Sequence, residues 1–165
     1  RSPSFWGASA CARGEPMGER ERLSGGCQCG AVRYTASVDP SAAYPCHCRM
    51  CQRATGGVYA ALVQTTAADC AFEGAPQWYA SSAIAERAFC PRCGSPIGFR
   101  YLDSAKLDLT VGTFDDPSRF RPGSQFGCES AVEGWQDLTG VAGMRSEDYQ
   151  PLQDKWRAAG AAPPE

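Results

Sequence analysis

Short runs of aromatic, β-branched and small apolar residues dominate the chain from Ala31 onward, and Gly, Pro or Asp bounds most of them. The clearest run is KLDLTVGTF (106–114), where Leu107, Leu109 and Val111 alternate with Asp108 and other polar residues. A period of two predicts a strand with one apolar face and one polar face. Similar runs predict short strands at residues 31–38, 57–65, 69–74, 76–82 and 95–101, with a weaker pattern at 125–130.

One helix is predicted, late in the chain. Ser146 is a candidate N-cap for the segment EDYQPLQDKWRAAG, in which Pro151 limits the start of the helix and Gly160 ends it. Residues 1–22 are rich in Gly, Ser, Arg and Glu without any period, so we expect a disordered or extension-derived tail there. Met17 offers a native start, so residues 1–16, Cys11 included, are left out of the fold prediction. The prediction is a mainly β domain of short antiparallel strands at 23–145, followed by a C-terminal helix and tail at 146–165.

Composition and charge narrow the class of protein. Hydrophobic residues make up 43% of the 165 residues and charged residues 21%, as is typical of a soluble globular domain. The net charge of −2 and the lack of a Lys/Arg-rich arm argue against a nucleic-acid partner. No apolar run approaches the roughly 18 residues that a membrane-spanning helix needs, so no membrane partner is expected.

Ten cysteines are the unusual feature of the composition. A disulfide framework would account for them in a secreted protein, but residues 1–26 contain no apolar signal segment. Seven of the cysteines also cluster at gaps of one or two residues. This spacing rarely allows a disulfide but lets both sulfurs face one metal ion. The pattern therefore favours thiolate–metal chemistry in a reducing, cytoplasmic environment.

The clustered cysteines form three groups. The most specific is in FCPRCGSP, because Pro91 presets the backbone and Gly94 allows the positive φ of a zinc-knuckle turn. Such a turn points backbone amides at the sulfurs but supplies only two ligands, so it needs two more from elsewhere. The groups are Cys27 and Cys29 in GGCQCG, Cys46, Cys48 and Cys51 in CHCRMCQRATGG, and Cys90 and Cys93 in the knuckle.

Seven cysteines divide naturally into four and three. Four thiolates make a closed structural zinc site, whereas three protein ligands with an open fourth position are the catalytic form. Pairing Cys27 and Cys29 with the knuckle gives the four, and Cys46, Cys48 and Cys51 are then the three. The alternative, in which the knuckle takes two of these three, leaves CQC without partners and ranks second.

Two other residues could close the three-cysteine group. His47 lies between Cys46 and Cys48, but in an extended segment its side chain points away from theirs, which favours a pocket wall or a bystander over a ligand. Cys128 is the other candidate for a closing ligand. Cys70 is isolated in a strand-like run, where a lone cysteine usually packs as a small apolar residue.

An open zinc site with three thiolates suits a particular chemistry. Its fourth position can bind an external thiol and lower the pKa of that thiol, or it can polarise a carbonyl group. Three thiolates leave the site with a net negative charge, which softens its Lewis acidity and favours sulfur as the substrate atom.

Five segments follow one another in a recognisable order: GGCQCGAVRY, CHCRMCQRATGG, ERAFCPRCGSPIGF, LDLTVGTFDDP and ESAVEGW. The set resembles the family of glutathione-dependent formaldehyde-activating enzymes, which includes centromere protein V. The resemblance implies a mainly β, zinc-bound tent fold and carbon–sulfur lyase activity that condenses formaldehyde with glutathione to S-hydroxymethylglutathione. It also implies a structural zinc on Cys27, Cys29, Cys90 and Cys93 and a second, more labile catalytic zinc on Cys46, Cys48 and Cys51.

On this interpretation the thiol of glutathione attacks the aldehyde at the three-cysteine site. Arg49 and Arg53, beside that site, are candidates to bind the carboxylates of glutathione. Gln125 departs from the family, whose members often carry a histidine at this position. Two alternatives stay open: a non-catalytic zinc-binding module with a binding or chaperone-like role, and a bare structural zinc domain whose second site is closed by His47 or Cys128.

Overall fold

The computed structural model describes residues 18–161, so most of the predicted N-terminal tail lies outside the described part of the chain. Two compact units are present, one ending at Val132 and the other beginning at Glu133. The first unit contains two antiparallel sheets and the short helix α1 (Arg49–Thr55), and the second contains helix α2 (Gln150–Ala158). The mainly β prediction is therefore confirmed. No helix in residues 18–161 is both long and apolar enough to cross a membrane.

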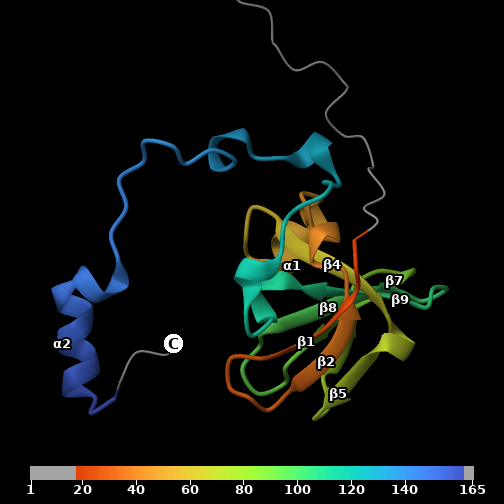
Figure 1. Cartoon of the computed structure of the whole chain (residues 1–165), viewed down its shortest axis with the longest axis horizontal. Helices are drawn as coiled ribbons and strands as arrows, with labels where there is room; N and C mark the ends of the chain where they lie inside the picture. The colour runs from red at the N-terminus through yellow and green to blue at the C-terminus, as the bar shows by residue number, and fades with distance from the viewer. Residues whose placement is uncertain (1–17, 162–165) are drawn as a thin grey trace, which may run out of the picture. The chain divides into compact units, whose positions relative to one another are not determined.

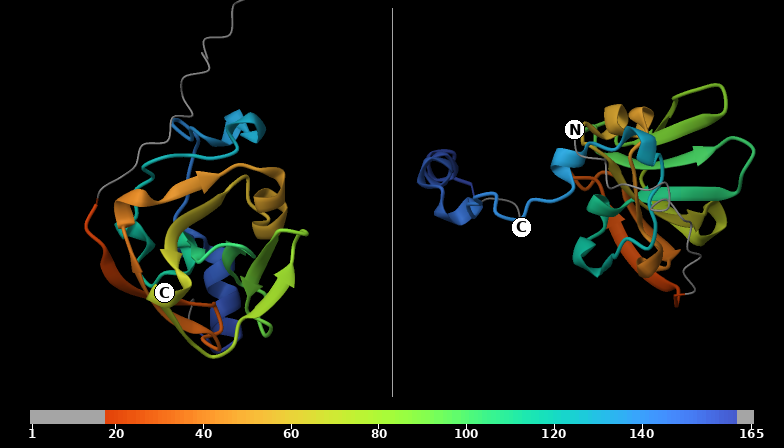
Figure 2. Two further views of the ribbon diagram at one scale, coloured as in Figure 1. Left: turned by 90° about the vertical axis from the view of Figure 1, so that its right-hand side faces the viewer. Right: turned by 90° about the horizontal axis from the view of Figure 1, so that it is seen from above.

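The two sheets have three and six strands, and neighbouring strands within each sheet are antiparallel. They face each other in Figure 1 and in the turned views of Figure 2. The small sheet has the order β1 (Glu21–Gly26), β2 (Arg33–Val38), β5 (Cys70–Glu73). The large sheet has the order β3 (Tyr44–Cys46), β4 (Ala60–Thr66), β9 (Lys106–Thr110), β8 (Pro96–Tyr101), β7 (Ala85–Phe89), β6 (Gln77–Ala80).

Strand alternation places the main core between the sheets. Tyr34 and Val38 of β2 belong to one buried cluster with Val63 of β4, Ile97 of β8 and Leu109 of β9. Ile97 and Leu109 are the largest fully buried side chains. Complete burial of an aliphatic side chain of this size contributes about 1.5–3 kcal/mol, so this interface between the sheets carries much of the stability.

The other face of the large sheet carries a second, smaller cluster. Ala60 and Leu62 of β4 pack there with Cys46 and Cys51. Because Leu62 and Val63 are successive residues of one strand, they point to opposite faces of the sheet. Helix α1 and its cysteines therefore lie on the side of the large sheet that faces away from the main core. The helix ends at Gly56, whose φ of 71° is a left-handed conformation that favours glycine.

Several predicted elements are confirmed with shifted ends. Strands β2, β4, β5, β6, β8 and β9 lie within or across the predicted runs, although β9 stops at Thr110 and a 3-10 turn follows. Strands β1, β3 and β7 and helix α1 were not predicted. The 3-10 turns are η1 (Pro40–Ala42), η2 (Ala67–Asp69), η3 (Val111–Thr113), η4 (Pro117–Arg119), η5 (Cys128–Ser130), η6 (Glu133–Trp135) and η7 (Ser146–Asp148).

Two local predictions are wrong. Residues 125–130 form no strand, since Phe126 makes one parallel bridge to Cys46 and the chain then turns into η5. Ser146 does not cap the helix, because it opens η7 while Tyr149 is the N-cap of α2. Asp108 lies on the face of β9 opposite Leu107 and Leu109, as predicted, but it is only 5% exposed because that face is covered as well.

Candidate functional site

The first cysteine group joins two turns that belong to different sheets. Cys27 and Cys29 follow β1 of the small sheet, while Cys90 and Cys93 lie in the turn between β7 and β8 of the large sheet. Their four sulfurs all lie within 4.8 Å of one another. Cys27 and Cys90 are buried, and the sulfurs of Cys29 and Cys90 are 3.8 Å apart.

Hydrogen bonds to sulfur support this four-cysteine group. The backbone N–H of Val32 donates to Cys27 Sγ at 3.3 Å. In the knuckle turn, Gly94 has a φ of 77° and its N–H donates to the carbonyl oxygen of Cys90. Hydrogen bonds from Ser95 lower the pKa of Cys93 to about 5. The bonds from Val32 and Ser95 stabilise thiolates, which are the form of cysteine that binds a metal, while the Gly94 bond holds the turn.

The second group is confined to one stretch of chain. Cys46 ends β3, Cys48 is the N-cap of α1 and Cys51 lies in the first turn of the helix. Their sulfurs also lie within 4.8 Å of one another, with 3.5 Å between Cys46 and Cys48. Hydrogen bonding from Cys46, together with a hydrogen bond from Arg87, lowers the pKa of Cys51 to about 5 despite its burial. The hydrogen bond to Cys51 and burial raise the pKa of Cys46 correspondingly.

Neither of the residues considered as a closing ligand belongs to this group. His47 is 3% exposed, and its ring lies edge-on to Tyr59 at 5.7 Å. Within residues 18–161, neither ring nitrogen has a hydrogen-bond partner. Its backbone N–H donates to the carbonyl oxygen of Phe126. Cys128 is disulfide-bonded and is not among the clustered ligands, whereas the seven clustered cysteines are free thiols.

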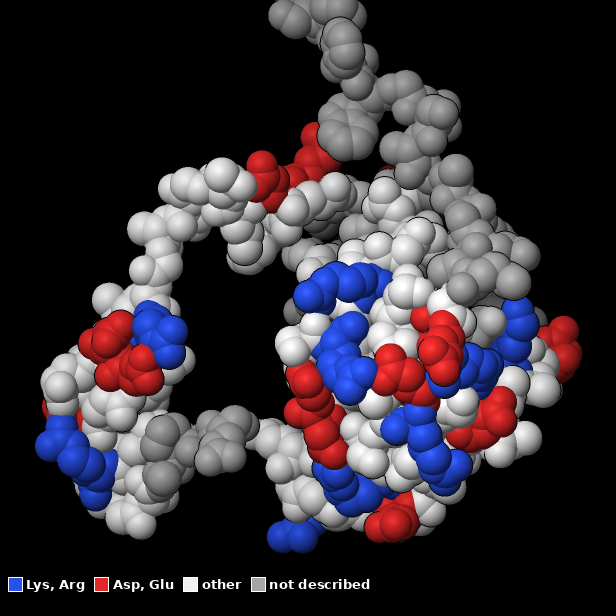
Figure 3. Space-filling model, viewed as in Figure 1, with Lys and Arg blue, Asp and Glu red and all other residues white. Residues whose placement is uncertain are grey.

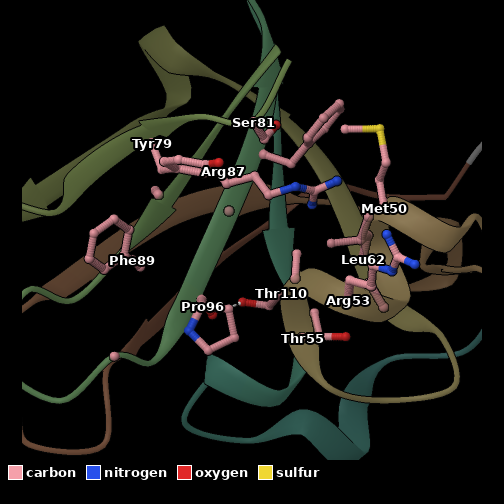
Figure 4. Close-up of a pocket in the computed structure, with 16 residues that line it drawn as sticks. Met50, Arg53, Thr55, Leu62, Tyr79, Ser81, Arg87, Phe89, Pro96 and Thr110 are labelled. Atoms are coloured by element: carbon pink, nitrogen blue, oxygen red, sulfur yellow. Dashed lines mark hydrogen bonds between the residues drawn. The ribbon is translucent and has the colours of Figure 1, made fainter.

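A pocket of about 600 Å³ opens on the same face of the large sheet. Figure 4 shows Arg87 extending from β7 across the pocket toward the side where Met50 and Arg53 of α1 lie. Arg87 Nη2 donates to Cys51 Sγ at 3.5 Å, so Arg87 links the pocket to the three-cysteine group, although none of the three cysteines is itself among the lining residues. No Asp or Glu is among the described residues that line it. The lining residues are Met50, Arg53, Ala54, Thr55, Ala60, Leu62, Tyr79, Ser81, Arg87, Ala88, Phe89, Gly94, Pro96, Gly98, Phe99 and Thr110.

Comparison with known proteins bears on what this arrangement is for. The sequence model of the family described as glutathione-dependent formaldehyde-activating enzyme matches residues 22–130, more than half of the chain. The chain belongs to this family. Both cysteine groups and all of the described pocket lining fall inside the matched region.

Two individual proteins show more distant similarity. An uncharacterised lyase of Schizosaccharomyces pombe is 31% identical over 79 residues, which cover 48% of this chain and 58% of the yeast protein. The match therefore spans little more than half of that relative. A crystal structure of a Rhodobacter sphaeroides protein is 23% identical, covers 56% of this chain and 88% of its own, and gives a TM-score of 0.49.

The two arginines proposed from the sequence have different surroundings. Arg53 lines the pocket. Arg49 donates to Gln52 Oε1 within α1 and is not among the lining residues, so its role toward a ligand stays a prediction. Gln125, the departure from the family pattern, is partly buried and also lies outside the lining.

Arg87 is the site residue that sequence reasoning missed. It lies on β7, which was not predicted because AERAF lacks a clear alternation of apolar and polar residues. The only signal was its position three residues before Cys90, and that position does not reveal which cysteine group it would meet. In the space-filling view of Figure 3, acidic and basic side chains are interspersed on the face shown.

Proposed function

We propose that this chain is a zinc-dependent enzyme of the carbon–sulfur lyase type that interconverts glutathione and formaldehyde with S-hydroxymethylglutathione. Membership of the family supports glutathione and formaldehyde chemistry in general. One observation carries the proposal: a three-thiol group adjoins a pocket that contains two arginines and no carboxylate. A ligand for such a site needs a negative charge and an atom that binds well beside thiolates.

Zinc is proposed for both groups from the chemistry of the donors. Four thiols with converging sulfurs fit a closed tetrahedral site, and three thiols fit the form whose remaining position is taken by substrate. Zinc held by Cys46, Cys48 and Cys51 would lower the pKa of a thiol that bound it and so favour the nucleophilic thiolate.

The residues of this chain bind and orient the reactants. Arg53 and Arg87 bind the carboxylates of glutathione and bring its thiol to the edge of the cysteine group. The apolar walls, Leu62 and Phe99 among them, exclude water around the aldehyde. In the forward direction one sulfur–carbon bond forms and the thiol proton ends on the aldehyde oxygen, and the reverse reaction breaks the same bond. We also propose a reducing compartment such as the cytoplasm, because it would keep the seven clustered cysteines as the free thiols that a metal needs, although Cys128 is disulfide-bonded.

The test is the rate of S-hydroxymethylglutathione formation measured by exchange NMR against the uncatalysed rate. Protein loaded with two zinc ions per chain should accelerate the exchange, and Cys48→Ser should abolish the acceleration. Cys70→Ser, which changes a free thiol outside both groups, is the matched control and should retain it. Absence of acceleration by the fully loaded wild-type protein would refute the proposed activity.

A non-catalytic binding module is the second candidate. It is favoured by the exposed apolar side chains of the second unit, namely Trp135, Leu138, Val141 and Met144. Exposed apolar residues on neighbouring segments are typical of surfaces that bind other macromolecules. If the loaded protein were inactive but bound an apolar peptide through these residues, the module would replace the enzyme as the better interpretation.

A further inference from the structure

Arg87 contacts the three-cysteine group and the pocket at the same time. Arg87 of β7 lies opposite Phe99 of β8 in the antiparallel pairing of these strands. The guanidinium carbon of Arg87 lies 4.8 Å from the centre of the Phe99 ring. From this position Nη2 donates to Cys51 Sγ at 3.5 Å. Stacking on an aromatic face fixes the plane of the guanidinium, so its contact with sulfur is built into the sheet.

No carboxylate of residues 18–161 forms an ion pair with Arg87 or with Arg53. The neighbouring Arg100 shows the contrast, because it stacks on Trp78 in the same manner but forms an ion pair with Glu86. A guanidinium has five N–H donors, and Cys51 accounts for one of those of Arg87. The remaining donors border a pocket whose described lining has no acidic residue to receive them.

The charge of the three-cysteine group explains why Arg87 should contact both that group and a ligand in the pocket. Three thiolates around a divalent metal leave a net negative charge among residues that are largely buried, since Cys46 and Cys51 are each 4% exposed. An anionic thiol approaching this charge would be repelled unless a cation lay between the two. Arg87 is placed between Cys51 and the pocket, where it stabilises the metal site and attracts an anion.

We propose that Arg87 is a positioning residue that holds Cys51 and the anionic end of the substrate together, and thereby selects anionic thiols over neutral ones. The proposal rests on the proposed function in taking zinc at the three-cysteine group and a glutathione-like thiol as the ligand. Arg53, which contributes charge to the pocket without a contact to the cysteines, is expected to affect the ligand alone.

Two readouts other than activity test this role. The first is the binding of S-methylglutathione to the zinc-loaded protein by calorimetry, because this probe keeps both carboxylates but cannot form a thiolate. The second is the retention of the more labile zinc against a chromogenic chelator. Arg87→Gln should weaken probe binding about tenfold and zinc affinity at the second site by about 10-fold or more. Arg53→Gln should weaken probe binding only.

Two further variants serve as controls. Arg100→Gln removes a stacked arginine from the next strand and should leave both readouts unchanged. Arg87→Lys keeps the charge and should recover part of each effect, which keeps the test decisive if Arg87→Gln folds poorly. If Arg87→Gln bound the probe as tightly as the wild type, or retained its zinc as well as the wild type, the proposal would be overturned even if the enzyme were active. Conversely, altered readouts together with an inactive wild-type protein would uphold the role of Arg87 in binding and refute the proposed reaction.

Discussion

Asp108 should make the stability of the first unit depend on pH, and replacing it with Asn should remove that dependence. Asp108 lies on the central strand β9 and is 5% exposed. The hydroxyl of Tyr44 donates to Asp108 Oδ1 at 2.8 Å. Burial raises the pKa of Asp108 from 3.8 to about 6, and its hydrogen bonds with Tyr44 and Gln64 only partly offset this.

The magnitude follows from the difference between the folded and unfolded pKa values. Well below pH 3.8 Asp108 is neutral in both states and has no effect on the free energy of unfolding. Between pH 4 and 6 the unfolded chain ionises while the folded protein keeps its proton, so stability falls as pH rises. Above pH 6 the penalty is constant, and a shift of about two units corresponds to about 3 kcal/mol.

The assay is urea unfolding of the wild type and Asp108→Asn at several values between pH 4 and 8. The difference in unfolding free energy between the two proteins should move by about 2 kcal/mol in favour of the variant as pH rises from 4 to 7, because part of the full shift lies below pH 4. Comparing the proteins at each pH cancels the loss of metal in acid, which affects both. Asp103→Asn, in the exposed turn between β8 and β9, is the matched control and should give a flat difference. A flat difference for Asp108→Asn as well would refute the reasoning.

Three other predictions concern the site. Cys93→Ser should lower the free energy of unfolding of the metal-loaded protein by several kcal/mol. Cys48→Ser should lower it by less than half as much, and equal losses for the two variants in urea titrations would contradict an open second site. Arg53→Gln should raise the KM for glutathione about tenfold with little change in kcat, and an unchanged KM in initial-rate measurements would contradict a role in binding. Gly127 has a φ of 68° and an added Cβ would lie 2.7 Å from the backbone N of Cys48. Gly127→Ala should therefore cost about 1–3 kcal/mol and lower the zinc content of the second site, whereas Gly112→Ala, which meets nothing within 4 Å, should do neither.

Alternation predicted strand β2 well, because Tyr34, Ala36 and Val38 are buried while the residues between them are partly exposed. The same pattern placed Asp108 correctly on the face opposite Leu107 and Leu109, which belong to the main core, but gave no sign that Asp108 would be buried. Alternation identifies the apolar face correctly, but it cannot show that another element covers the polar face.

The residue recorded against Asp108 is Tyr44 of β3, a strand that the sequence did not predict, and helix α1 was missed as well. Helix α1 has seven residues, too few to display an amphipathic stripe, and Cys48 and Cys51 occupy positions where apolar residues would reveal one. The spacing of three residues between these cysteines is compatible with one turn of helix. Gly56 is a glycine, the residue type that most often follows the last turn of a helix. Such short helices are formed by tertiary packing more than by intrinsic propensity, so the sequence alone gave no basis for α1.

The separation of the cysteines along the chain distinguishes the roles of the two groups. Cys29 and Cys90 are 61 residues apart in sequence, yet their sulfurs are 3.8 Å apart, and they tie a turn of the small sheet to a turn of the large sheet. A metal there closes a long loop and opposes separation of the sheets, which is a contribution to folding. Cys46, Cys48 and Cys51 all lie within one short segment, so a metal there closes almost no loop. The benefit of keeping three thiols together must then come from what they bind, and the adjoining pocket with Arg87 is where that ligand would enter.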